Sequence, residues 1–290
     1  MTESTELVAE PSGSTEPLTI RLQHTRGFSR VLSPRELWHY RDLAGQIATR
    51  DLKVRYRQTA LGVAWAILQP LVTMVVFSVF FGRLAGVPSQ DGIPYPVFTL
   101  AALVPWTFFA GAVQLGSDSL VANGPLVSKI YFPRVFIPGG VVVAGLVDLA
   151  IGLVILLITT LAYGIVPGPE ILLLPAFVLI AVLTAFGLTC FLSSLNVRYR
   201  DVRYVVPFLV QLGLFATPIA YAGDTVDQPW QTLWALNPMV GVADGFRWAV
   251  LGIGGTPWTT FAVSAVSALV IFIGGLAYFD RVERSFADLL

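Results

Sequence analysis

Long apolar runs alternate with short polar segments over most of the chain, and this pattern predicts membrane-spanning helices. A helix needs about 20 apolar residues to cross a hydrocarbon core of about 30 Å. Six runs reach or approach that length. We expect spans at Ala60–Phe81, Val97–Ser117, Ile137–Tyr163, Ile171–Leu195, Val205–Tyr221 and Thr260–Phe279.

One further apolar segment, Met239–Leu251, is too short to span comfortably. It follows Asn237 and Pro238, a pair that favours a helix start because the Asn side chain caps the helix and Pro fits its first turn. Together with Trp230–Leu236 it predicts a re-entrant helical hairpin on the extracytoplasmic side. A seventh span is the alternative, and it would move the C-terminal arginines outside.

Composition and charge placement support a membrane protein with a defined orientation. Of 290 residues, 55% are hydrophobic and 12% are charged, and the mean hydropathy is +0.73. Soluble domains carry about 25% charged residues. Sixteen of the 18 Lys and Arg residues fall on one side if the N-terminus is inside, which leaves only Arg83 and Arg247 outside. Positive residues are retained on the cytoplasmic side, so we expect a multi-pass protein of the cytoplasmic (inner) membrane with both termini cytoplasmic.

The chain divides into three parts. Residues 1–34 are rich in Ser, Thr, Glu and Pro and have no apolar signal-peptide core, so we expect a disordered cytosolic tail. Residues 35–58 predict an amphipathic interface helix, and residues 59–290 an all-α, six-span transmembrane domain. An apolar stripe along the interface helix would rest on the membrane surface, or the helix would serve only as a topology anchor. The stripe comprises Leu37, Tyr40, Ala44, Ile47 and Ala48.

Four cations stand immediately before the first span, namely Arg50, Lys53, Arg55 and Arg57. They have two interpretations. Positive residues at this place retain the N-terminus inside. Guanidinium groups also bind phosphate in a bidentate manner, so the cluster could guide a phosphate-bearing lipid toward an entrance.

The loop from Asn123 to Pro138 is unusually apolar for a segment that faces water. An exposed apolar cluster rimmed by charge is typical of a protein contact, so we consider a docking surface for a soluble partner. Packing against the bundle is the alternative. The residues concerned are Ser128, Lys129, Ile130, Tyr131, Phe132 and Arg134.

Few residues within the spans carry reactive chemistry. Asp148 is the clearest ionisable group, and its isolation favours a structural hydrogen bond over a proton relay. Cys190 is expected to be a small buried hydrophobe. Both histidines precede the first span, and neither lysine follows a glycine, so no Walker A motif is present. We therefore expect a chain that is not an enzyme, without its own cofactor, metal or nucleic-acid partner.

Aromatic residues of the first and fifth spans could stack on sugar rings along a channel, although most membrane aromatics are packing residues or interfacial anchors. The candidates are Trp65, Phe77, Phe208, Phe215 and Tyr221.

Four ordered motifs resemble the permease subunits of ABC-2 type polysaccharide exporters, the group that exports O-antigen, teichoic acid and galactan. The resemblance runs from about residue 35 to the C-terminus. The motifs are DLKVRYRQTALG (Asp51–Gly62) with Trp65, Gln69 and Pro70; SKIYFPRVFIP (Ser128–Pro138); NVRYRDV (Asn196–Val202); and Asn237, Pro238 and Met239 with Phe246 and Arg247.

The resemblance implies a homodimer that binds two copies of a separate ATP-binding-cassette ATPase, which would hold ATP and Mg. A lipid-linked polysaccharide would pass through the channel. The loop around Ser128–Arg134 would contact the ATPase, and Arg198, Arg200 and Asp201 would lie on a second cytoplasmic loop, where an Arg–Asp pair could hold its shape. The outer gate would comprise Trp230, Trp234, Asn237, Pro238, Phe246 and Arg247.

Three other functions remain open. An exporter of a drug or free lipid differs only in cargo. An integral-membrane enzyme acting on lipid-linked sugars would need chemistry from Asp224, Asp227 and Asp244, which lack an accompanying histidine. A proton-coupled transporter would need titratable groups at broken helices, and no such relay or internal repeat is visible.

Overall fold

The computed structural model describes residues 38, 40–57, 63–129, 132–223, 230–255, 258–283 and 286. Every regular element in these ranges is helical. The elements are α2 (Arg41–Arg57), α3 (Val63–Phe77), η1 (Ser78–Leu84), η2 (Gln90–Gly92), α4 (Tyr95–Ala122), α5 (Gly124–Lys129), α6 (Phe136–Ala162), η3 (Pro169–Leu173), α7 (Leu174–Arg198), α8 (Val202–Ala216), α9 (Trp230–Trp234), α10 (Pro238–Leu251) and α11 (Trp258–Val282).

Five described helices are long and apolar enough to cross a membrane, and they coincide with five of the six predicted spans. They are Ala64–Leu84, Tyr95–Ala122, Phe136–Ala162, Pro169–Arg198 and Trp258–Val282. The long apolar runs could be read reliably because length and hydropathy alone define them. The first of these helices ends in a π-helical segment, η1.

The sixth predicted span, Val205–Tyr221, appears as the shorter helix α8 of 15 residues. At 1.5 Å per residue such a helix covers only about 22 Å, less than a hydrocarbon core. The six-span count is therefore not established. The segment predicted as a hairpin forms the short helix α9, a turn and the 14-residue helix α10, and its re-entrant placement in a membrane stays a prediction.

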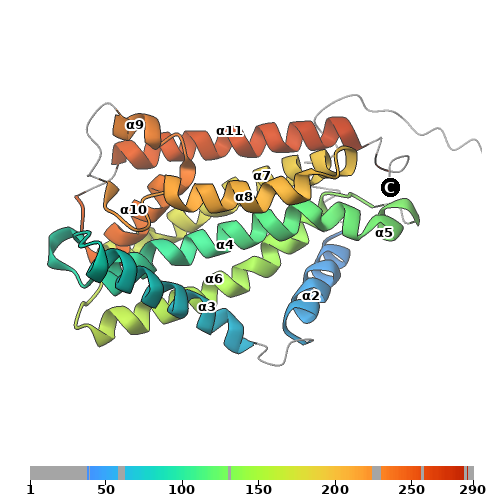
Figure 1. The fold of residues 1–290 in the computed structure, drawn as a ribbon. Helices are drawn as coiled ribbons and strands as arrows, with labels where there is room; N and C mark the ends of the chain where they lie inside the picture. Colours follow the sequence, from blue (N-terminus) through green and yellow to red (C-terminus); the bar gives the residue numbers. More distant parts are fainter. Residues whose placement is uncertain are drawn as a thin grey trace, which may run out of the picture.

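The long helices run roughly parallel, with α4 at the centre of the bundle (Figure 1). Helix α4 packs on α6, α7, α10, α3 and α8. Close packing of α7 and α11 depends on glycine, because a Cβ on Gly275 would lie 2.0 Å from the carbonyl oxygen of Gly187. Such small-residue contacts let helix backbones approach closely in membranes.

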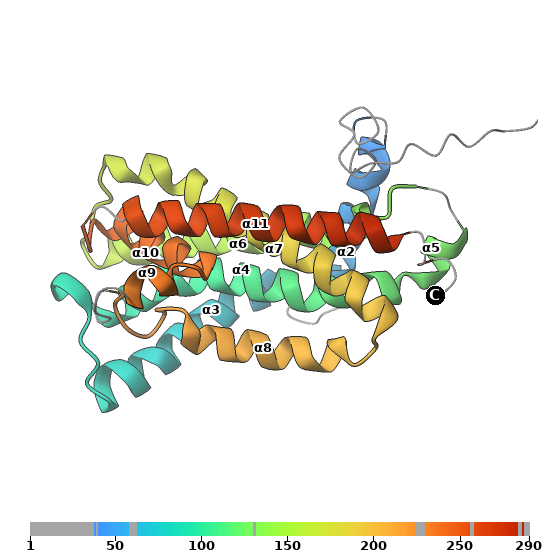
Figure 2. The same ribbon diagram turned by 90° about the horizontal axis from the view of Figure 1, so that it is seen from above.

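The two ends of the bundle differ. At one end, the α10 end, α9, α10 and the loop between η1 and α4 gather (Figure 1). At the other, the α5 end, lie α5, α2 and the C-terminal end of α11. Helices α3 and α8 flank α4 on the same side of the molecule, as the two views together show (Figures 1 and 2).

Candidate functional site

Helices α3 and α8 present apolar side chains outward. Trp65 on α3 is 58% exposed, and Phe208 and Phe215 on α8 are 60% and 55% exposed. Three of the five aromatic residues predicted to line a channel therefore lie on open faces of the single chain. Tyr221 is only partly buried and lies beyond the end of α8.

Phe77 does not share that environment. Its ring is 8% exposed and lies 5.2 Å from the ring of Phe81, within the main apolar core. Its place in the first span suggested a channel residue, but its side of the helix faces α4 and the rest of the bundle. Within this chain Phe77 is a packing residue.

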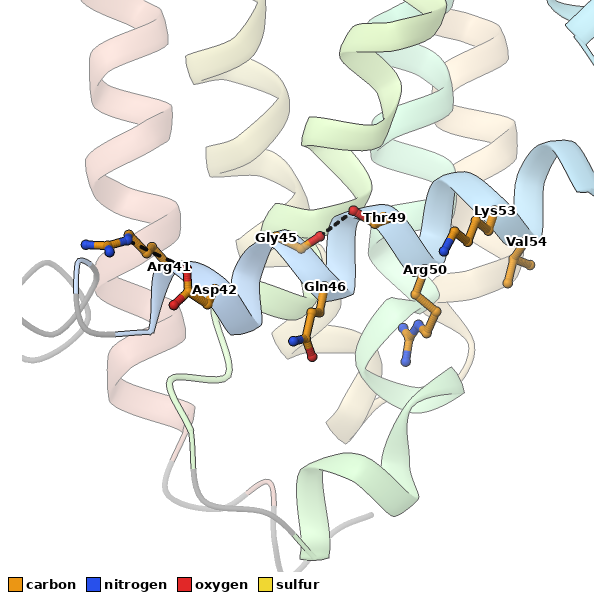
Figure 3. Close-up of a pocket in the computed structure, with 8 residues that line it drawn as sticks. All are labelled: Arg41, Asp42, Gly45, Gln46, Thr49, Arg50, Lys53 and Val54. Atoms are coloured by element: carbon orange, nitrogen blue, oxygen red, sulfur yellow. Dashed lines mark hydrogen bonds and ion pairs between the residues drawn. The ribbon is translucent and has the colours of Figure 1, made fainter.

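Helix α2 crosses the long helices at a steep angle near the α5 end (Figure 3). Ile47 and Ala48 from the predicted stripe are buried, and α2 packs on α6. A Cβ on Gly140 of α6 would lie 2.9 Å from Ile47 Cγ2 and 3.3 Å from an oxygen of Asp51, so glycine permits this close crossing. The stripe therefore contacts protein as well as any membrane surface.

The opposite face of α2 borders a shallow hollow of about 620 Å³, and Figure 3 shows the side chains around it. Arg50 is engaged with Asp51, since its Nη2 lies 2.9 Å from Asp51 Oδ1. Lys53 is exposed. Arg55 and Arg57 belong to α2, but their side chains lie outside the described part. The lining residues are Arg41, Asp42, Gly45, Gln46, Thr49, Arg50, Lys53 and Val54.

Asp148, the ionisable residue of the third predicted span, accepts a hydrogen bond from the hydroxyl of Tyr56. Tyr56 lies on α2, so this bond ties the interface helix to the middle of α6. A structural hydrogen bond was the favoured expectation for Asp148, and Tyr56 is one partner. Sequence reasoning missed Tyr56 because it stands 92 residues away. Cys190 is fully buried in apolar surroundings, as expected.

The segment predicted to contact an ATPase is only partly described. Ser128 and Lys129 end helix α5, although their side chains are outside the described part, and Ile130 and Tyr131 lie outside it entirely. Phe132 is 5% exposed and packs in a second apolar core at the α5 end. Its ring therefore does not contribute to an exposed docking surface, because it packs against other side chains of the same chain and is shielded from solvent.

Arg134 is also engaged within the chain. Its backbone N–H donates to Glu283 Oε1 at 3.2 Å, and its guanidinium donates to the Glu283 carbonyl oxygen. The guanidinium also lies 6.0 Å from the ring of Phe286. Arg134 therefore joins the start of α6 to the residues that follow α11.

Arg198 at the end of α7 and Arg200 and Asp201 in the loop that follows are exposed. The expected Arg–Asp pair does not form among these three described residues. The Arg198 guanidinium instead lies 5.5 Å from the ring of Tyr199. Asn196, near the end of α7, is buried and donates to Ser117 O at 3.0 Å, a contact with α4 that local sequence could not reveal.

At the α10 end, the predicted helix start is confirmed. Asn237 Oδ1 accepts from Met239 N at 3.1 Å, and Pro238 occupies the first turn of α10. Trp230 is 66% exposed, whereas Trp234 is partly buried and stacks on Tyr221 with ring centroids 5.4 Å apart.

Phe246 and Arg247 of α10 are buried, at 0% and 2% exposed. The Arg247 guanidinium lies 3.7 Å from the ring centroid of Phe98 and 3.6 Å from an oxygen of Asp244. It also donates to three backbone carbonyls from two other parts of the chain, Phe98, Ile219 and Tyr221. A buried arginine with this many partners is a fixed structural element.

No metal site is visible among the described residues, which contain no group of three or more His, Cys, Asp or Glu side chains placed to share an ion. Asp224 and Asp227, which the enzyme alternative would use, lie outside the described part.

Comparison with known proteins identifies the family to which the chain belongs. The ABC-2 type transporter family matches residues 43–251. The chain belongs to the ABC-2 type transporter family. This match contains the exposed faces of α3 and α8, most of α2, and the whole α9–α10 region.

The chain is also similar to proteins that are named as permeases or transport proteins. The O-antigen export system permease protein RfbA of Myxococcus xanthus is 35% identical over 255 residues, which cover 86% of this chain and 96% of that protein. The Klebsiella pneumoniae protein of the same name is 27% identical over 252 residues, 86% of this chain and 95% of that protein. The polysialic acid transport protein KpsM of Escherichia coli is 22% identical over 237 residues, 81% and 92% respectively.

Proposed function

We propose that this ABC-2 permease is the membrane-spanning subunit of an exporter that moves a lipid-linked polysaccharide across the cytoplasmic membrane. A separate ATP-binding-cassette subunit, in two copies, would hydrolyse ATP with Mg. The observation that carries the proposal is the near full-length similarity to permeases named for O-antigen export. The relative named for polysialic acid transport supports a polysaccharide cargo independently.

The exposed faces of α3 and α8 support a conduit built from two copies. Helices α3 and α8 flank α4 on one side of the chain (Figure 2), and Trp65 on α3 and Phe208 and Phe215 on α8 are exposed. Two such faces brought together would enclose a passage lined by aromatic rings. Aromatic faces suit sugars because a sugar ring presents C–H groups to the ring while its hydroxyls remain hydrated.

The hollow on α2 supports a role in receiving the lipid carrier. Its cationic residues Arg41, Arg50 and Lys53 would attract a phosphate or pyrophosphate group at the membrane surface. Arg55 and Arg57 would add to that attraction. Arg50 is paired with Asp51, and Arg41 Nε lies 3.7 Å from Asp42 Oδ1, so Lys53 is the freest of these three cations to meet an incoming anion.

Charge placement supports the orientation. Most Lys and Arg residues lie toward the α5 end or in the N-terminal segment, so we assign the α5 end to the cytoplasm and the α10 end to the outside. The ATPase would then contact α5 and the loop of Arg198, Arg200 and Asp201, whose side chains are exposed. Helices α9 and α10 would form the re-entrant outer gate.

Reconstitution tests this proposal directly. The full chain is placed in vesicles with its ATPase and with a lipid-linked polysaccharide, and polymer that becomes protected inside or released outside is measured. We expect transport only with ATP, Mg and the ATPase together. Transport by the chain alone would contradict the proposal, as would ATP-driven transport of a free lipid or drug with no transport of the polymer.

A further inference from the structure

The burial of the chain changes abruptly where α8 ends. Of the residues in α8, only Val206 and Val210 are buried. The segment immediately after the helix, Thr217–Ala220, is buried at every position. A largely exposed helix is therefore followed by a short irregular segment that enters the interior of the α10 end.

Irregular backbone in such a place needs hydrogen-bond partners, because the last carbonyl groups of a helix have none within the helix. Side chains from several elements supply them. Trp234 Nε1 donates to Ala216 O at 2.6 Å, and Tyr95 OH donates to Ala220 O at 2.7 Å. Tyr221 OH donates back to Phe215 O at 2.7 Å.

Arg247 completes this set from α10. Its Nη2 donates to Ile219 O at 2.9 Å and its Nη1 to Tyr221 O at 3.3 Å. The same guanidinium donates from Nε to Phe98 O at 3.3 Å, which joins the segment to α4. We call the four donors Tyr95, Tyr221, Trp234 and Arg247 the carbonyl clamp. A planar guanidinium with five N–H donors suits several fixed carbonyls at once.

The rest of α8 packs on α4 and α7 through a narrow face that includes the buried Val206 and Val210. An apolar cavity of about 210 Å³ lies beside that face, between α8, α4 and α7, so part of the inner side of α8 lacks packing contacts. Pro207 lies inside α8 and removes one backbone donor near its first turns. The cavity is lined by Trp106, Phe109, Val113, Leu188, Leu192, Val206, Leu209, Val210, Gly213 and Asn237.

We propose that α8 is a hinged helix whose pivot is the carbonyl clamp, with Arg247 as the positioning residue. The outer end of α8 stays fixed to α4 and α10, while the rest of the helix, up to its start at Val202, moves relative to the apolar cavity that borders Val206 to Gly213. The inference deepens the proposed function, since it makes α8 a wall of the conduit that moves at the end where an ATPase would bind. Arg247 then belongs to a fixed anchor and not to the moving part of a gate.

Hydrogen exchange of the full chain in lipid nanodiscs tests the clamp without nucleotide or polymer. Tyr95→Phe and Trp234→Phe each remove one donor and conserve most of the packing. We expect exchange of peptides covering residues 215–223 to accelerate roughly fivefold for each variant, the ratio that follows from one net hydrogen bond. Exchange within residues 202–209 should stay unchanged.

Arg247→Lys keeps the charge and removes the planar fork, so it should accelerate exchange of residues 215–223 by more than either ring variant. Arg83→Lys is the matched control, because Arg83 is also placed outside by charge, is exposed and makes no described clamp contact. The proposal is overturned if the clamp variants leave residues 215–223 unchanged or accelerate all of α8 equally. Should Arg247→Lys not fold, the two ring variants still decide.

A second measurement tests the hinge in the complex with the ATPase. Cysteines replace Tyr204, near the start of α8, and Leu212, near its end, in a Cys190→Ala chain, and their thiol-labelling rates are compared with and without nucleotide. We expect nucleotide to change the rate at position 204 by at least twice the change at position 212. Equal changes, or none, would overturn the hinge. If the chain does not export polymer but hydrogen exchange of residues 215–223 responds as stated, the carbonyl clamp is supported and only the proposed function is contradicted.

Discussion

Helices α3 and α4 are neighbours in the chain, and both are apolar enough to cross a membrane, yet their surroundings differ greatly. In the most apolar 18-residue stretch of α4, 78% of the residues are buried, against 11% in the corresponding stretch of Ala64–Leu84, the span that contains α3. Similar hydropathy therefore serves two purposes: α4 forms the core, whereas α3, like α8, offers an apolar face to something outside the single chain. In a bilayer, such an exposed apolar face contacts lipid or a second copy of the chain. The difference in burial therefore separates residues that stabilise the fold from residues that are available for function.

Truncating a leucine should separate the two classes most strongly. Leu100 on α4 is fully buried, whereas Leu68 on α3 is 39% exposed. Leu100→Ala should lower the free energy of unfolding by about 2–5 kcal/mol through lost contacts and the cavity left behind. Leu68→Ala should change it by about 0.5 kcal/mol or less. Thermal unfolding of both variants in the same detergent checks this, and equal losses would contradict the distinction.

Adding one methyl group to the glycine contact between α7 and α11 should have the next largest effect. A Cβ at Gly275 would lie 2.0 Å from Gly187 O, whereas one at the adjacent Gly274 would meet nothing within 4 Å. Gly275→Ala should destabilise the chain by about 1–3 kcal/mol because backbone must move. Gly274→Ala is the matched control and should be neutral or slightly stabilising. The thermal midpoint of each purified variant is the measurement.

Removing an exposed ring should affect transport and spare stability. Phe208→Ala on α8 should lower polymer export roughly two- to tenfold, if one ring–sugar contact is worth about 0.5–1.5 kcal/mol, as for an aromatic pair. Ile158→Ala is the control, since Ile158 is 63% exposed and lies on α6, outside the α3–α8 pair. Vesicle export and thermal midpoint are measured together. Equal loss of export in both variants would contradict the proposal that the exposed rings of α8 line the polymer path.

The smallest effect is expected where α2 is tied to α6. Tyr56→Phe removes the hydroxyl that donates to Asp148 and should lower stability by about 0.6 kcal/mol, the average for polar contacts between membrane helices. Tyr278→Phe is the matched control, because the described contact of Tyr278 is with the ring of Phe191 and does not use the hydroxyl. Equal thermal midpoints for both variants would mean that the Tyr56 bond contributes nothing measurable.

The sequence was sufficient for those parts of the fold that depend on length and hydropathy. Five apolar runs became long helices within a few residues of their predicted bounds, and Asn237 caps α10 as its residue type suggested. The end of α8 was placed too late. Its true limit depends on donors such as Tyr95 and Arg247, which lie more than 20 residues from the carbonyls they meet.

Side-chain environments were harder to predict than helices. Phe77 and Phe208 are the same residue type and both lie in apolar runs, but Phe77 is buried and Phe208 is exposed. Which face of a helix is covered depends on neighbouring helices that come from elsewhere in the chain. Phe132 lies in the α5-end core for the same reason. Local charge complementarity also misled, since Arg198 lies against Tyr199 and not against Asp201.

The central claim is that the α3–α8 side faces an aqueous polymer path while the other exposed apolar surfaces face lipid. Single cysteines at Phe208 and Phe215 on α8, and at Val154 on α6 and Val266 on α11, are placed in a Cys190→Ala chain and exposed to a charged, membrane-impermeant thiol reagent in vesicles with the ATPase. All four positions are more than half exposed in the single chain. The account predicts labelling at 208 and 215 that polymer slows during turnover, and no labelling at 154 or 266. Equal labelling at all four positions, or labelling only on α6 and α11, would contradict it.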